Sequence, residues 1–112
     1  MANTFKLKTG ASVGTSLETV YTVPAATTAV MIGAMMANKS ASAITVDVQI
    51  VTASSAGENA DDVYIIKSVS IPTGGTLEAI EGKVVLETGD IVKALASATA
   101  ALDVALSVME IT

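Results

Sequence analysis

The sequence predicts an all-β protein, an antiparallel β-sandwich of jelly-roll-like type with about nine short strands and little or no helix. Runs rich in Val, Ile and Thr alternate apolar and polar residues with the two-residue period of a half-buried strand. Turn residues separate these runs at intervals of about 8 to 12 residues, which is typical of sandwiches and barrels. The 112 residues contain no fixed repeat or linker, so one domain, residues 1–112, is expected.

The first three strands are expected in the N-terminal third of the chain. Residues 5–8 alternate apolar and charged residues, and the segment from Gly10 to Gly14 is expected to end this strand. Residues 17–23 stop before Pro24, whose missing N–H would interrupt a ladder. Residues 28–38 are apolar almost throughout, which predicts a strand covered on both faces or placed in a subunit contact.

The clearest alternation lies in residues 44–50, where Thr, Asp and Gln alternate with Val and Ile, so this strand should have one wet face. Residues 93–106 are rich in Ala and Leu and could form a helix on propensity alone. Strict alternation in the last segment favours a strand preceded by a tight turn at 97–101. The strands expected after residue 50 are 63–71, 76–80, 83–86, 91–96 and 102–111.

The composition indicates that part of the protein's surface is buried in contacts with other protein chains. Hydrophobic residues make up 51% of the chain and charged residues 15%, against about 25% charged in an average soluble domain. A small domain exposes much of its chain, so we expect part of the apolar surface to be buried by copies of the chain or by another protein. The alternative is a monomer whose surface is rich in alanine.

The charges argue against nucleic-acid and membrane partners. The net charge is −5 and the six basic residues are all lysines, so no arginine is present to grip phosphate or guanine. An anionic membrane is disfavoured for the same reason. The N-terminus lacks the apolar stretch of a secretion signal, and the longest apolar run, residues 29–37, is about half of the ~20 residues that a spanning helix needs.

The residue inventory excludes most catalytic chemistry. The chain has no histidine and no cysteine, and therefore lacks the usual general base, thiol nucleophile and zinc ligands. The carboxylate pairs Glu78 with Glu81 and Glu87 with Asp90 could serve a glycosidase, but a sugar site normally adds aromatic platforms and a deep cleft. We expect these acids to keep turns soluble, with no catalytic residue and no cofactor.

Three loop segments are candidates for ligand sites. Residues 53–62 form a polar loop whose oxygens could reach calcium, but the spacing lacks the alternating ligand order of a dedicated calcium loop. The candidate ligands there are Glu58, Asn59, Asp61 and Asp62. The glycines at 10–14 and 74–75 lack the lysine and hydroxyl of a phosphate loop. We therefore expect solvated turns without a metal.

Five residues are candidates for a protein interface. Met31, Met35 and Met36 form either an adaptable interface stripe or ordinary gap-filling core. Lys6 and Lys8 either meet an acidic neighbour in an assembly or blunt an edge strand against uncontrolled pairing. The sequence leaves both alternatives open.

The chain carries a "VPA" turn in residues 22–30, an "N-x-S" turn in residues 37–40 and the alternating strand at 44–50. These are followed by YIIK at 64–67, IPTGGTLE at 71–78, LETGD at 86–90 and LSVMEI at 106–111. In this order, these segments resemble small virion proteins of tailed bacteriophages. The resemblance implies a non-catalytic β-domain that decorates or cements capsids, or sits in a neck or tail, commonly as a trimer.

Three functional hypotheses follow. The first is a capsid decoration or cement protein, a homotrimer located in the virion that binds the major capsid protein and stabilises the head. The second is a neck, tail or fibre-base component of the same particle. The third is a carbohydrate- or cell-surface-binding module, which the scarcity of aromatic residues disfavours.

Overall fold

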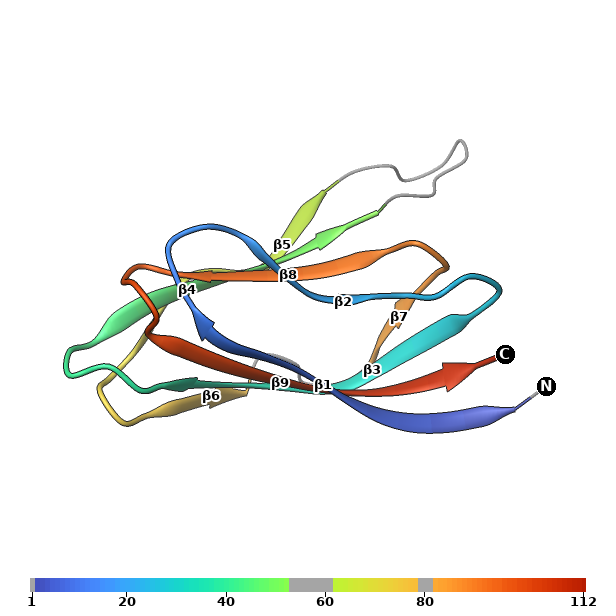
Figure 1. Ribbon diagram of the computed structural model, residues 1–112, viewed down its shortest axis with the longest axis horizontal. Helices are drawn as coiled ribbons and strands as arrows, with labels where there is room; N and C mark the ends of the chain where they lie inside the picture. The colour runs from blue at the N-terminus through green and yellow to red at the C-terminus, as the bar shows by residue number, and fades with distance from the viewer. Residues whose placement is uncertain (1, 53–61, 79–81) are drawn as a thin grey trace.

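The computed structural model describes residues 2–52, 62–78 and 82–112, and within them every regular element is a strand. Two antiparallel sheets pack together (Figure 1), which confirms the predicted all-β sandwich of about nine strands. The strands are β1 (Asn3–Val13), β2 (Glu18–Thr22), β3 (Thr28–Asn38), β4 (Ile44–Val51), β5 (Val63–Ile71), β6 (Thr76–Glu78), β7 (Val84–Leu86), β8 (Ile91–Ala96) and β9 (Leu102–Ile111).

The strand order is that of a jelly roll. Sheet A has the order β1-β9-β3-β6, with β7 also pairing β3, and sheet B has the order β2-β8-β4-β5. The first strand thus pairs with the last, β2 with β8, β3 with β6 and β7, and β4 with β5. This nested pairing places two linked Greek keys on the two sheets, and β6 and β7 together fill the place of one strand.

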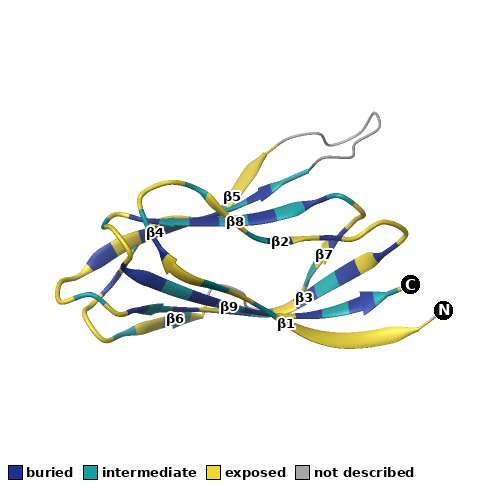
Figure 2. Cartoon of the chain, viewed as in Figure 1, coloured by how far each residue is buried: buried dark blue, intermediate teal, exposed yellow. Residues whose placement is uncertain are grey.

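The core lies between the two sheets and consists mainly of aliphatic side chains, with methionines and Tyr21 among them. In β9 alternate residues point inward, and Leu102, Leu106 and Val108 are each at most 1% exposed. Met31 and Met36 lie beside them on the neighbouring strand β3, point into the same core and are 0% exposed. Figure 2 shows the resulting alternation of buried residues with intermediate or exposed ones along β3, β8 and β9.

The first strand is longer than predicted. The expectation that the glycines after residue 8 end it was wrong, because β1 continues to Val13, which pairs with Leu102 and is 1% exposed. A register shift between Gly10 and Val13 accommodates the glycine-containing segment. Ser12 adopts a positive φ of 56° there, and its N–H donates a 2.9 Å hydrogen bond to Asp103 Oδ1.

The remaining strands follow the alternation closely. The ambiguous C-terminal segment forms β8 and β9, so tertiary pairing overrides the helix propensity of its Ala and Leu residues. The face of β4 predicted to be solvent-exposed is partly buried. Asp47 on this face is 6% exposed and accepts hydrogen bonds from Lys67 Nζ and the Ser68 N–H. The end of the strand expected at 76–80 lies beyond the described residues after Glu78.

Asn38 joins three segments at one end of the sandwich. Its side chain is 2% exposed, and Nδ2 donates to the carbonyl oxygens of Ser42 at 2.9 Å and Ile71 at 3.0 Å. Its Oδ1 accepts from the N–H of Ser40 at 2.9 Å. Asn38 therefore holds the turn after β3 against the end of β5 in sheet B.

We expect Asn38→Ala to lower the free energy of unfolding by about 1–3 kcal/mol, because it leaves the buried Ile71 carbonyl without this donor. Urea denaturation measures this difference. Ser40→Ala, which removes only a turn hydroxyl, is the matched control and should cost less than about 1 kcal/mol. Equal midpoints for the Asn38 variant and the wild type would contradict the role of Asn38.

Candidate interaction surface

Two of the carboxylates considered for catalysis, Asp90 and Glu78, accept hydrogen bonds from the backbone. Asp90 is 6% exposed, and its Oδ2 accepts a 2.9 Å hydrogen bond from the N–H of Glu87. Glu78 accepts a 2.8 Å hydrogen bond from the N–H of Ala34. Asp90 therefore holds its own turn, whereas Glu78 ties β6 to β3.

Several residues proposed as ligands or acids lie outside the described residues. These are Glu58, Asn59, Asp61 and Glu81. Asp62 is described and immediately precedes β5. Among the described residues, no three His, Cys, Asp or Glu side chains gather in a way that could hold a metal ion. The same residues include no helix that could cross a bilayer.

An apolar ridge crosses the outer face of sheet A, the face turned away from sheet B. The register places Phe5 beside Met109, Met109 beside Val30, and Val30 beside Val85. These four residues, which define the apolar ridge, come from β1, β9, β3 and β7. Phe5 is 71% exposed and Val85 is 64% exposed.

The apolar character continues beyond the ridge on the same face. Leu7, two residues after Phe5, is 65% exposed, and Met35 is 53% exposed. Ile32 lies in the bulge of β3 opposite Ser107 and is also exposed. Five of the seven exposed large hydrophobic side chains among the described residues thus belong to the outer face of sheet A. Grouping of this kind marks interaction sites, whereas scattered single residues do not.

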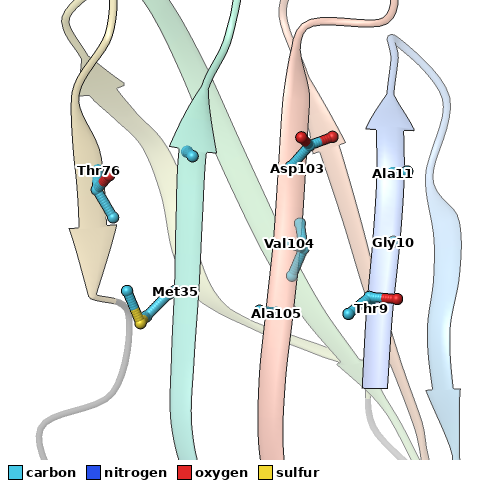
Figure 3. A pocket seen from close by; sticks show the side chains of 9 residues that line it. Thr9, Gly10, Ala11, Met35, Thr76, Asp103, Val104 and Ala105 are labelled. Carbon is cyan, nitrogen blue, oxygen red and sulfur yellow. The ribbon is translucent and has the colours of Figure 1, made fainter. Parts of the chain in front are cut away.

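A shallow trough of about 350 Å³ lies on this face, on the opposite side of Leu7 from the ridge. Figure 3 shows its lining on β1, β9, β3 and β6. The lining combines the small residues Gly10, Ala11, Ala37 and Ala105 with Thr9, Met35, Thr76, Asp103 and Val104. Small residues side by side on adjacent strands leave this hollow, which has room for side chains of another protein.

The acidic side chains on this face are already partnered. Besides Glu78, Asp103 lies here, and its Oδ1 is 3.0 Å from Lys39 Nζ. The Ser12 N–H and then Lys39 hold the pKa of Asp103 below its ordinary value by hydrogen bonding to the ionised form. The face therefore combines exposed apolar side chains with two carboxylates, Glu78 and Asp103, that accept hydrogen bonds within the chain.

Lys6 and Lys8 lie on the opposite side of β1, towards sheet B. Lys6 Nζ is 3.0 Å from Glu110 Oε1, and Lys8 Nζ is 5.7 Å from the centre of the Tyr21 ring. Both lysines therefore interact within their own chain. A contact of either lysine with another chain stays a prediction.

Glu110 and Tyr21 form a buried pair between the sheets. The Tyr21 hydroxyl donates a 2.5 Å hydrogen bond to Glu110 Oε2, and the two residues are 4% and 5% exposed. Burial, followed by the bond to Glu110, raises the pKa of the Tyr21 hydroxyl. The hydrogen bond from Tyr21, followed by Lys6, lowers the pKa of Glu110.

The three methionines predicted to be either core or interface residues lie in different places. Met31 and Met36 are buried in the core, while Met35 points to the outer face of sheet A. Sequence reasoning missed Phe5 and Leu7, although the alternation of residues 5–8 was recognised. That alternation does not say which side of the strand is covered, and here the lysines face sheet B.

Comparison with protein-family models, curated proteins and solved structures found no match to this chain.

Proposed function

We propose that this chain is a non-enzymatic structural protein of a tailed-phage virion, a capsid decoration protein that binds the major capsid protein and stabilises the head. The outer face of sheet A is the contact surface in this proposal. The supporting observation is the group of five exposed large hydrophobic side chains beside the trough. Covering such a face is favourable by about 25 cal/mol for each Å² of apolar surface removed from water.

The composition and the resemblance support the same proposal. A charged fraction of 15% suits a subunit that works in contact with other proteins. Jelly rolls occur in viral capsid domains and in lectins, so the fold alone does not choose between these functions. The trough has no aromatic side chain among its lining residues, which counts against a sugar-binding module. In a shell, many repeated weak contacts add up to strong attachment.

Electron cryo-microscopy of particles with and without the encoding gene tests this role. We expect extra density on the head only when the chain is present, and heads that rupture at lower temperature when it is absent. Density at the neck or tail would replace the decoration role with the second hypothesis. Particles that never contain the chain would contradict the virion proposal.

Adding purified protein to particles that lack the gene tests the contact face. Phe5→Glu is expected to weaken binding at least about tenfold, because it places an unpaired charge in an apolar contact. Ser70→Glu is the matched control, since Ser70 is exposed on the edge strand of sheet B. Equal binding of the two variants would exclude the outer face of sheet A as the contact surface.

A further inference from the structure

We infer that the outer face of sheet A packs in solution on the same face of a second copy of this chain, about a two-fold axis that runs across the strands. The inference does not depend on the proposed function, but both use the same face, so the dimer has to separate before the chain binds the capsid protein through it. The axis follows the row formed by Leu7, Ser107 and Gly33, which are neighbours in register on β1, β9 and β3.

The relief of the face is self-complementary about this row. On one side of the axis, the next row of outward-facing residues is the apolar ridge. On the other side, the outward-facing rows line the trough. A half-turn about the axis reverses the strand direction while each strand stays opposite its own copy. Met109 then lies over Ala105 of the second copy, and Val30 lies over Met35 of the second copy. The ridge of each molecule thereby enters the hollow of the other.

Two of the three axis residues, Gly33 and Ser107, are small, so the sheets can approach closely at β3 and β9, while Leu7 packs on its own copy at β1. Gly33 has no side chain, and a Cβ placed on it would already lie 3.8 Å from the Cβ of Ser107. Ser107 itself is small and exposed. Sheets packed face to face are usually about 10 Å apart, and small central residues permit a shorter spacing.

The area of the face is sufficient for a stable contact. Four strands span about 19 Å at the usual spacing, and the length of β9 is about 34 Å, giving roughly 650 Å² for each copy. The sum for two copies, roughly 1,300 Å², lies within the range of specific protein interfaces. The half-turn sets Glu78 opposite Val85 and Asp103 opposite Ile111 of the second copy. Glu78 accepts a hydrogen bond from the Ala34 N–H and Asp103 pairs with Lys39, so both carboxylates keep partners inside their own chain in the contact.

The outer face of sheet B is more polar than that of sheet A, and its exposed Tyr64 ring is already contacted by Lys67 Nζ, 4.6 Å from the ring centre. Thr45 and Ser70 are opposite each other there, and Lys67 pairs with Asp47 on the same face. A two-fold contact through sheet A leaves these polar faces in water on both sides. Such an isologous contact is closed, so it produces a dimer and not an open filament.

Sedimentation velocity of the full chain tests the inference. The wild type is expected to be a dimer, and Leu7→Glu is expected to raise the dissociation constant at least about a hundredfold, because two carboxylates would face each other across the axis. Leu7 is 65% exposed, so the variant should fold, and circular dichroism checks its β content. Ser70→Glu adds the same charge to the edge of sheet B and should remain dimeric.

A mixture of Leu7→Glu with Leu7→Lys tests the symmetry itself. The two-fold axis sets residue 7 opposite its own copy, so the mixture should dimerise at least about tenfold more strongly than either variant alone. A wild-type monomer at high concentration overturns the inference, as does equal dimerisation of Leu7→Glu and Ser70→Glu. A mixture that does not recover, or a trimeric wild type, overturns the two-fold arrangement.

Particle binding separates this inference from the proposed function. A monomeric chain that still attaches to particles through Phe5 would leave the virion role intact and show that the partner is the capsid protein alone. A dimer that is absent from particles would support the second-copy contact and contradict the virion role.

Discussion

Met36→Ala is expected to lower the free energy of unfolding by about 2–5 kcal/mol, whereas Met35→Ala should change it by less than about 1 kcal/mol. The two methionines are adjacent on β3 but point to opposite faces of sheet A. Met36 is 0% exposed, so its truncation leaves a cavity between the sheets. Met35 is 53% exposed and has little packing to lose within one chain.

Urea denaturation in a monomeric background, such as Leu7→Glu, measures this contrast without a contribution from self-association. The slope of free energy against urea should stay the same for both variants, since the fold is unchanged. Equal losses of stability at positions 35 and 36 would show that the assignment of the inner and outer faces of β3 is wrong.

Glu110→Ala is expected to lower the free energy of unfolding by about 2–4 kcal/mol. The substitution leaves the buried Tyr21 hydroxyl without its acceptor and removes the partner of Lys6. Lys6 is partly exposed, which moderates the loss because water solvates its charge. Glu110→Gln keeps an oxygen that can accept from Tyr21, so it should cost less. Equal losses for the two variants would contradict a role for the hydrogen bond.

The stabilisation from the Glu110 carboxylate should depend on pH in a defined direction. Its pKa in the folded protein is lowered from the ordinary value of 4.5, so the ionised form favours folding. The contribution is present above pH 4.5 and is lost as the pH falls through the lower folded-state pKa. The stability difference between wild type and Glu110→Gln should therefore shrink on acidification. A difference that is constant from pH 7 to about pH 3 would contradict this linkage.

The sequence predicts the strands well because alternation in a two-sheet protein is a local signal. The bounds predicted for the strands at 28–38, 63–71, 91–96 and 102–111 are those observed. The end of β1 was misplaced because glycine favours turns, whereas pairing with β9 and burial of Val13 carry the strand onward. Those stabilising contacts come from the far end of the chain and have no local signature.

The interaction surface was less accessible to sequence reasoning. Apolar character at residues 28–38 predicted either a doubly covered strand or a subunit contact, and Met35 belongs to the exposed side of that strand. The apolar ridge joins four strands, so the proximity of Phe5 and Val85 becomes visible only once the strand order is known. Periodicity separates the two sides of a strand, but the topology decides which side faces a core.

The most direct test of the outer face of sheet A as a protein contact is the rate of maleimide labelling of a cysteine introduced there. The chain has no cysteine, so Ser107→Cys on this face and Ser70→Cys on sheet B each give a single reactive thiol. In the assembled protein, we predict labelling at residue 107 at least about tenfold slower than at residue 70, with similar rates after dilution to monomers. Equal rates at the two positions in the assembled protein would show that water, and not another protein, covers this face.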